Sequence, residues 1–528
     1  MPQRTVGALA VILLLVVPPA RGGGADEAWR AVRCPSPAPE AKPALTVEVS
    51  PWVLGNLYEP GRTVRLRVRG PKGVVHWRLE GYGGKAVAHG QGPACDTVIK
   101  LPLNRPGWYA CRIERRVAGK AVETQVFRCA AVPPNDSDRR NTFVGVCTHF
   151  SRPQAWPSEG LAVLRRLGIT EIRDELGWGG VERRKGAFAL PEGPSAFLDV
   201  AVKLGIRPLL IFDYSNRHYD GGGFPNSDEA VDAYARYCRE LAVIFRGKVD
   251  AFEVWNEWSG GCGMKGRPGE NTPEAYARLL KAAYRTVKAA RREVTVVGIG
   301  GEHSKHHFEK IRGMLEAGAG HHLDALSVHP YRYPRSPEES DLVGEVEKVA
   351  DLAREHGASV RLWITEIGWP THVGKRGVDE RTQARYAVRT MALLAGTGFV
   401  DKVHWYDFKN DGMDRGHNED NFGIVWHQDY NWAPKPAAVA LSVFARETAG
   451  AEPKSLWQVG NARVARFQRP DGTDLIVAWA APGAASVTVD GEEVTVRDTM
   501  GVPTRLKDRL DLGPDPLYVT GRGLRVSQ

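Results

Sequence analysis

Between residues 141 and 448 the 528-residue sequence alternates eight short apolar runs with amphipathic stretches of helical period. The runs are TFVGVCTHF, ITEIRDEL, RPLLIFDYS, VDAFEVWNEW, VTVVGIG, LDALSVHPY, VRLWITEIGW and DKVHWYDF. Between them, stretches such as DEAVDAYARYCRELAVIF repeat apolar residues at helical spacing. Eight strand–helix units in about 300 residues predict an α/β fold with a (β/α)8 TIM barrel over 141–448. A doubly wound sheet is disfavoured, because no GxGxxG turn follows the first run.

Two segments with a different rhythm flank the predicted barrel. Short runs that alternate apolar and polar residues, broken by Gly and Pro, fill 45–134 and again 451–528. In TVRLRVRG the residues Val64, Leu66 and Val68 would face inward and the arginines between them outward. This period of two predicts an N-terminal β-sandwich over 45–134 and a small C-terminal β-domain over 451–528.

The first residues resemble a leader segment rather than part of the fold. Arg4 precedes an apolar run from Val6 to Val17, and prolines and small residues follow it. This order predicts a signal peptide over 1–25 and a Pro- and Ala-rich linker over 26–44. We therefore expect a secreted, periplasmic or cell-surface protein with no membrane span after cleavage. Export permits disulfides. One disulfide among Cys95, Cys111 and Cys129 is possible, and the sequence does not tell which two of them would pair.

The charge balance narrows the classes of partner. The formal net charge is +9, which is mildly basic and argues against a nucleic-acid partner. Residues 45–131 contain fourteen Lys plus Arg against six Asp plus Glu, so most of the excess lies in the N-terminal β-domain. Two interpretations stay open for this excess, a solvated sheet face or a patch that binds an anionic polysaccharide.

Catalytic residues of such barrels lie at the carboxyl ends of the strands, and the apolar runs end in polar and aromatic side chains. The candidates there are Arg173, Asp213, Tyr214, Asn256, Glu257, His329, Tyr331, Glu366 and Trp405. A glutamate at the end of an apolar strand is costly unless something pairs or uses it. Glu257 and Glu366, each near tryptophans that can stack on sugar rings, therefore predict a paired-carboxylate glycosidase site.

The barrel segment resembles the clan A glycoside hydrolases. WNE at 255–257 is similar to their acid/base motif, and WITEIGW at 363–369 is similar to their nucleophile motif. The stretches RDELGWGGVERRKGAF and IFDYSNRHYDGGGFP look most like glycoside hydrolase family 39, with family 5 next. The resemblance implies a retaining mechanism on a carbohydrate substrate with no cofactor. We expect no metal site either, because no carboxylate completes a known ligand spacing with the histidines between 303 and 322.

The resemblance also implies roles for the candidates. Glu257 would be the general acid/base and Glu366 the nucleophile. Asn256 would bind the sugar 2-hydroxyl, Tyr331 would donate to the nucleophile, and Arg173 would hold it ionised. His329 would contact either the sugar or a neighbouring protein group. Trp405 would be the platform under the bound ring, and Asp213 and Tyr214 would complete the sugar site. We also expect the charge of Glu366 to raise the pKa of Glu257.

Alternatives to a hydrolase remain on the same scaffold. One is a catalytically inactive carbohydrate-binding or surface protein, and another is a transglycosylase that uses the same glutamate pair. Two loops have no matching motif. The Gly-rich loop 259–271 contains Cys262, and the acidic loop KNDGMDRGHNED after the eighth run lacks the residue order of a calcium loop. We interpret the acidic loop as part of the substrate side of the barrel.

Overall fold

The structure of the protein is a computed structural model that describes residues 29–35, 43–135, 140–152, 156–263, 270–301, 306–358, 361–506 and 508–528. The expected signal peptide, 1–25, lies outside the described residues. Within the described ranges, no helix combines the length and the apolar character that a membrane crossing requires.

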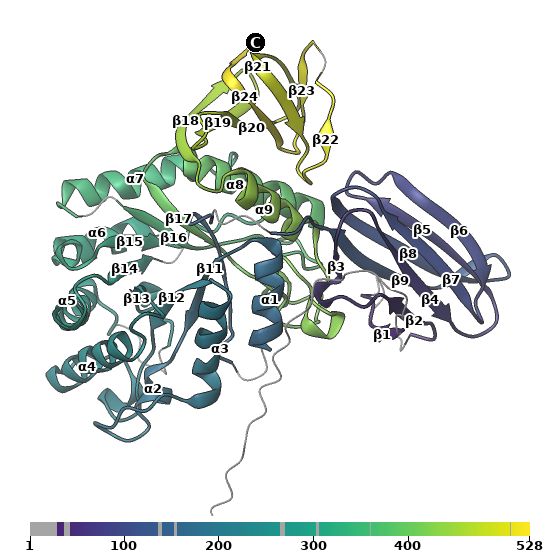
Figure 1. Cartoon of the computed structure of the whole chain (residues 1–528). Helices are drawn as coiled ribbons and strands as arrows, with labels where there is room; N and C mark the ends of the chain where they lie inside the picture. Colours follow the sequence, from purple (N-terminus) through teal and green to yellow (C-terminus); the bar gives the residue numbers. More distant parts are fainter. Residues whose placement is uncertain are drawn as a thin grey trace, which may run out of the picture.

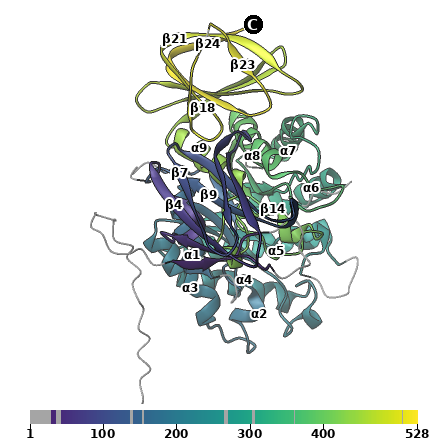
Figure 2. The same cartoon turned by 90° about the vertical axis from the view of Figure 1, so that its right-hand side faces the viewer.

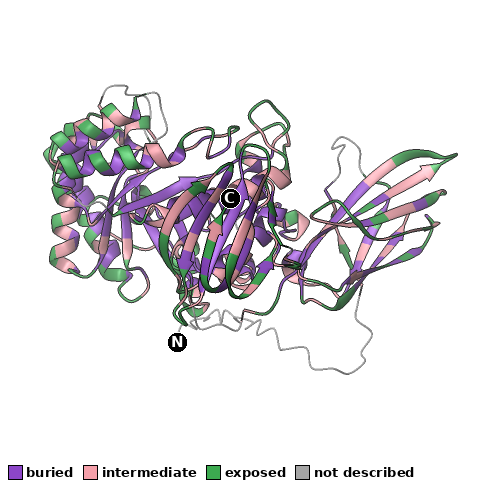
Figure 3. Ribbon diagram, turned by 90° about the horizontal axis from the view of Figure 1, so that it is seen from above, coloured by how far each residue is buried: buried purple, intermediate pink, exposed green. Residues whose placement is uncertain are grey.

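Eight parallel strands close into a barrel in sequence order, as the alternating pattern predicted (Figure 1). They are β10 (Val144–Cys147), β11 (Glu171–Glu175), β12 (Arg207–Phe212), β13 (Ala251–Val254), β14 (Thr295–Gly301), β15 (Ala325–Val328), β16 (Leu362–Ile367) and β17 (Val400–Trp405). The ring closes where Gly145 of β10 pairs with His404 of β17. Figure 3 shows buried residues along these strands and exposed residues on the outer helices, which explains the continuous apolar character of the runs.

Nine α-helices accompany the barrel strands in the described part of the chain. They are α1 (Pro157–Leu167), α2 (Trp178–Val181), α3 (Glu192–Lys203), α4 (Asp228–Ile244), α5 (Pro273–Ala290), α6 (His307–Glu316), α7 (Leu342–Glu355), α8 (Glu380–Gly396) and α9 (Pro436–Glu447). Four of them begin after a side chain that accepts a backbone hydrogen bond from the first turn: Ser227, Thr272, Asp341 and Asp379. Such caps satisfy N–H groups that have no partner within the helix.

The N-terminal domain consists of two facing sheets, one in the order β1-β2-β4-β7 and one in the order β3-β9-β8-β5-β6. The strands are β1 (Arg30–Val32), β2 (Thr46–Ser50), β3 (Leu57–Tyr58), β4 (Arg62–Arg69), β5 (Val74–Gly81), β6 (Ala86–Pro93), β7 (Thr97–Leu103), β8 (Gly107–Val117) and β9 (Lys120–Ala131). Val64, Leu66 and Val68 are fully buried between the sheets, as predicted.

Part of the expected linker is a strand. Residues Arg30–Val32 form β1 and pair antiparallel with β2 at the edge of the first sheet. The alternation in RAV is too short to be seen in the sequence, and the free edge of β2 supplies the hydrogen bonds. The disulfide that the sequence left possible is not present, because Cys95, Cys111 and Cys129 are all described and none of them is in a disulfide.

Two of the outward-facing arginines of β4, Arg67 and Arg69, pair with nearby acids. Arg67 contacts Asp96 at 2.6 Å, and Arg69 lies 3.4 Å from Glu48. These ion pairs favour the interpretation of a solvated sheet face for this part of the basic excess.

The C-terminal domain is a seven-stranded, antiparallel sheet. It contains β18 (Glu452–Val459), β19 (Ala462–Gln468), β20 (Asp474–Ala480), β21 (Ala485–Arg497), β22 (Pro503–Thr504), β23 (Leu510–Leu512) and β24 (Leu517–Ser527). Figures 1 and 2 both show this domain next to α8 and α9, and the contacts of α8 with β18 and β19 agree. The fold is therefore a TIM barrel with β-domains at both ends of the chain.

Asp515 joins all three domains. Its carboxylate accepts hydrogen bonds from Tyr82 of the N-terminal domain at 2.6 Å, and from Arg381 and Arg385 of α8 at 2.7 and 2.8 Å. Burial would raise the pKa of Asp515, but these donors outweigh burial and lower it to about 2.

Candidate active site

A cavity of about 540 Å³ opens at the carboxyl ends of the barrel strands. Six of the nine residues that the sequence singled out line it: Arg173, Tyr214, Asn256, Glu257, Tyr331 and Glu366. The strands β11, β13 and β16 position the charged members, since Arg173 and Glu366 lie within strands and Glu257 is the third residue after β13. Closure of the barrel brings together side chains that are far apart in the sequence.

Arg173 is the centre of a buried network of hydrogen bonds. Its guanidinium donates to Glu366 Oε1 at 2.6 Å, to Glu253 Oε2 at 2.6 Å and to Asn256 Oδ1 at 2.7 Å. The Arg173 side chain is only 4% exposed, and that of Glu253 is fully buried. A guanidinium can satisfy several acceptors in one plane, which fixes the positions of all three partners. Glu253 lies inside an apolar strand, and the sequence reading missed it.

Glu366 is held by two donors. Arg173 contacts Oε1, and the Tyr331 hydroxyl donates to Oε2 at 2.7 Å. Both hydrogen bonds go to the charged form of the carboxylate and stabilise it. The side chain keeps 11% of its surface exposed toward the cavity. Glu366 is therefore a carboxylate oriented by two donors, with access to a ligand.

Glu257 is paired with an imidazole. Nδ1 of His329 lies 2.9 Å from Glu257 Oε1, and Nε2 lies 2.9 Å from Thr365 Oγ1. The Thr365 hydroxyl donates its hydrogen to Glu253 at 2.9 Å, so its oxygen accepts from Nε2 of His329. Nε2 thus carries a hydrogen, and the contact between Nδ1 and Glu257 contains one further proton that the two groups share.

The electrostatics of this pair differ from the sequence-based expectation for Glu257. Burial would raise the pKa of Glu257, but hydrogen bonds from His329 and Cys262 and the charge of Arg173 outweigh it and lower the pKa. Burial would likewise lower the pKa of His329, whereas the charges of Glu366 and Glu257 raise it. The expected upward shift of the pKa of Glu257 was wrong, because the hydrogen bond and the charge of His329 favour the ionised form of this carboxylate.

Cys262 is a site residue that the sequence reading did not assign. Its thiol donates to Glu257 Oε2 at 3.4 Å, on the oxygen that His329 does not contact. Backbone contacts hold Cys262 next to Glu257: its N–H donates to the Glu257 carbonyl at 3.3 Å, and its own carbonyl accepts from the Trp255 indole at 3.1 Å. A thiol is only a weak hydrogen-bond donor, and the sequence of the Gly-rich loop does not indicate that the Cys262 side chain points toward Glu257.

The two glutamates are close together. One oxygen of Glu257 and one of Glu366 lie within 4.8 Å of each other, with a nitrogen of His329 at the same range. Carboxyl groups about 5–5.5 Å apart are typical of retaining glycosidases, whereas inverting enzymes separate them by roughly 6.5–9.5 Å. The spacing fits the shorter class.

Three predicted site residues do not line the cavity. His329 is 1% exposed and contacts Glu257 and Thr365, which favours the protein contact over a sugar contact. Asp213 is also 1% exposed, and burial followed by the charge of Glu175 raises its pKa well above the ordinary value. Trp405 is fully buried and stacks on Trp369, so it cannot be a platform for a ring in the cavity.

Tyr406, one residue further along the chain than Trp405, lines the cavity in place of the expected Trp405. Successive side chains point to opposite sides near a strand end, so a shift of one residue exchanges the inner and outer positions. Tyr333 and Phe422 also line the cavity. Its walls therefore offer aromatic faces of the kind that pack on sugar rings.

Several solved structures resemble the chain. A family 39 glycoside hydrolase from the gut symbiont Bacteroides cellulosilyticus matches with a TM-score of 0.72 and 24% identity, over 89% of this chain and 99% of that chain. The family 39 enzyme from Xanthomonas axonopodis pv. citri matches with a TM-score of 0.51 and 14% identity, over 74% and 94%. The family 30 xylanase C catalytic domain from Talaromyces cellulolyticus gives 0.52 and 13%, over 72% and 97%.

No protein-family model matches the sequence, and no curated protein matches it. The structural likeness nevertheless extends over the barrel and the flanking domains, because the Bacteroides match leaves little of either chain uncovered. The chain has the fold of a family 39 glycoside hydrolase, with family 30 and related clan A hydrolases next in similarity.

Proposed function

We propose that the protein is a retaining glycoside hydrolase that cleaves O-glycosidic bonds of an oligo- or polysaccharide. The observation that carries the proposal is the pair of carboxylates in one cavity with different partners. Glu366 accepts hydrogen bonds from Arg173 and Tyr331, and Glu257 shares a proton with His329. The fold of family 39 glycosidases supports the same reaction class.

The first step forms a bond between Glu366 and the anomeric carbon. The ionised carboxylate attacks while the bond from that carbon to the leaving oxygen breaks. The leaving oxygen takes the proton that Glu257 shares with His329, and Glu257 is the member of this pair that faces the cavity. Asn256, held by Arg173 and donating to Tyr214 at 3.1 Å, lies beside the attacking carboxylate and can bind the neighbouring sugar hydroxyl.

The second step releases the sugar. Glu257, now ionised, accepts a proton from water as the water oxygen attacks the anomeric carbon from the side that the leaving group vacated. The bond to Glu366 breaks and its carboxylate is restored. Two inversions at one carbon give a product with the anomeric configuration of the substrate.

A direct test is capture of the glycosyl-enzyme. A panel of chromogenic aryl glycosides identifies the sugar, and the 2-deoxy-2-fluoro analogue of that sugar slows the second step. We expect intact-protein mass spectrometry to show one added glycosyl group, located on the peptide that contains Glu366. The Glu366→Gln protein is the control and should remain unlabelled. Hydrolysis without any trapped intermediate, or labelling of another peptide, would contradict the retaining mechanism.

The proposal extends to the cellular location, on sequence grounds. The leader at residues 1–25 supports export to the periplasm, the cell surface or the medium. Expression of the full-length gene followed by N-terminal sequencing of the exported protein tests this. An N-terminus between residues 20 and 30 is expected, and a protein that keeps Met1 inside the cell would contradict it.

A further inference from the structure

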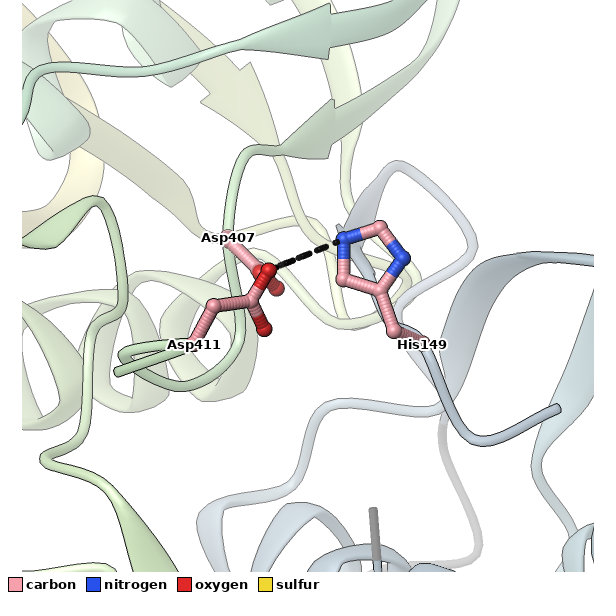
Figure 4. A group of neighbouring side chains, drawn as sticks. All are labelled: His149, Asp407 and Asp411. Carbon is pink, nitrogen blue, oxygen red and sulfur yellow. Dashed lines mark ion pairs between the residues drawn. The ribbon is translucent and has the colours of Figure 1, made fainter. Parts of the chain in front are cut away.

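A second group of side chains with ligand chemistry lies at the edge of the cavity. His149 follows β10, Asp407 follows β17, and Asp411 lies in the acidic loop beyond it. Figure 4 shows the three side chains directed toward one another. Nε2 of His149 is 3.7 Å from Asp407 Oδ2 and 3.6 Å from Asp411 Oδ2. None of these contacts is short enough for a hydrogen bond.

The buried atoms of this group lack the partners that buried polar atoms normally have. Both ring nitrogens of His149 are shielded from solvent, and neither has a hydrogen-bond partner among the described residues. The Asp407 side chain is 3% exposed, and the one N–H that donates to it, from Phe408, goes to Oδ1. Buried polar atoms in folded proteins are normally hydrogen-bonded, so these unpartnered atoms are suited to binding a ligand.

Two neighbouring cations, Lys409 and Arg152, contact Asp411 of this group. Lys409 contacts Asp411 at Oδ1, 3.2 Å away, which leaves Oδ2 directed at His149. Arg152 lies 3.8 Å from Asp411 and 3.8 Å from Glu175.

We propose that His149, Asp407 and Asp411 form a binding site for one divalent cation with mixed nitrogen and oxygen preference, such as Zn²⁺ or Mn²⁺. One imidazole nitrogen and two carboxylate oxygens are common ligands of these ions. Bonds of about 2.0–2.2 Å in a tetrahedral arrangement place ligand atoms about 3.5 Å apart, close to the two measured separations. His149 also lines the cavity, so the proposed site lies at its edge.

The catalytic trio Glu257, His329 and Glu366 is a rival location for an ion, because its ligand atoms also lie within 4.8 Å of one another. Each of its members already has a close hydrogen-bond partner, however, including Arg173 on Glu366 and Thr365 on His329. In the group around His149, the hydrogen bonds to the carboxylates go to Oδ1 of Asp407 and Oδ1 of Asp411, and neither ring nitrogen of His149 has a hydrogen-bond partner among the described residues. The cation site is therefore separate from the proposed chemistry and does not depend on it.

The experiment measures metal binding without any sugar. The full chain is stripped with a chelator and titrated with Mn²⁺, with loss of the free-ion paramagnetic resonance signal as the readout, and then with Zn²⁺ by calorimetry. We expect a single bound equivalent at micromolar concentrations. His149→Ala and Asp411→Asn should each weaken binding by about tenfold or more, because each removes a ligand. Thermal unfolding of each variant verifies that it is folded.

Two further variants make the result decisive. His417→Ala is the matched control, since His417 is an exposed histidine that contacts a single carboxylate, Asp420, at 3.1 Å. It should bind the ion as the unaltered protein does. Glu366→Gln should also retain binding. Absence of binding up to about 1 mM, unchanged binding in His149→Ala, or loss of binding only in Glu366→Gln would each overturn the proposal. Glycosidase activity does not enter any of these readouts, so failure of the proposed function would be seen separately.

Discussion

Nδ1 of His329 lies 2.9 Å from Oε1 of Glu257, so the expected acid/base is joined to a buried imidazole rather than standing alone. The pKa of His329 is raised and that of Glu257 is lowered, which places the shared proton on the imidazole in the free protein. The two groups then titrate as a pair, and the proton leaves only when the pH exceeds the raised pKa of His329.

This relationship predicts the alkaline limb of the pH–rate profile. The pair supplies the proton for the leaving group, so kcat/KM should fall as the pH rises through the raised pKa of His329, above its ordinary value of about 6.5. In His329→Gln, Glu257 alone binds the proton that the leaving group receives. The midpoint of the alkaline limb should therefore move to lower pH by about one unit or more. An unchanged midpoint in the variant would mean that another group controls this limb.

Removal of either carboxylate should abolish turnover of natural substrates. We expect Glu366→Ala and Glu257→Ala each to lower kcat by about 10³-fold or more while the protein stays folded. Azide or formate should restore part of the activity, as nucleophile in place of Glu366, or by attack on the glycosyl-enzyme in Glu257→Ala with an activated aryl glycoside. Steady-state assays with both anions test this, and wild-type rates in both variants would exclude the assigned site.

The stereochemical outcome follows from the spacing of the glutamates. Because oxygens of Glu257 and Glu366 lie within 4.8 Å, no water fits between the nucleophile and the sugar. The first product seen by ¹H NMR, before mutarotation, should therefore have the anomeric configuration of the substrate. The inverted anomer as first product would rule out direct attack by Glu366.

Cys262 should act as a positioning residue through Glu257. Its thiol stabilises the charged carboxylate from the side opposite His329, so Cys262→Ala should raise the pKa of Glu257 and lower kcat a few-fold, about 2–5-fold. Cys262→Ser keeps a donor at this point and should remain close to the unaltered protein in kcat and in its pH profile. Equal behaviour of the two variants would show that the contact has no effect on the reaction.

Asp515 should stabilise the arrangement of the domains. Asp515→Asn leaves Arg381 and Arg385 without their carboxylate, at a cost of about 1–3 kcal/mol. Because its pKa is lowered to about 2 in the folded protein, the stabilisation is complete above the unfolded value near 4 and is lost between about pH 4 and pH 2. Thermal unfolding should show a lower Tm for the variant at pH 7, with the difference shrinking toward pH 2. The exposed Asp511→Asn serves as control.

Much of the fold could be predicted from the sequence, because its signals are local. The eight apolar runs correspond to β10 through β17, and the period-two stretches correspond to the flanking sheets. The strand β1 was not predicted, because three residues are too few to show the alternation of apolar and polar residues. Glu257 and Glu366 could be found for the same reason as the strands, because a carboxylate at the end of an apolar run is visible in the sequence.

The sequence by itself thus determined the barrel, its flanking sheets and the two carboxylates, through hydrophobic period and motif. Only the tertiary structure decided which side chains meet. Barrel closure brings Arg173 to Glu366 and His329 to Glu257, and it places His149 opposite Asp407. The direction of a side chain at a strand end changes with each residue, which is why Tyr406 and not Trp405 reaches the cavity. Contacts of this kind depend on strand order and side-chain direction, and neither is encoded in a local pattern of residues.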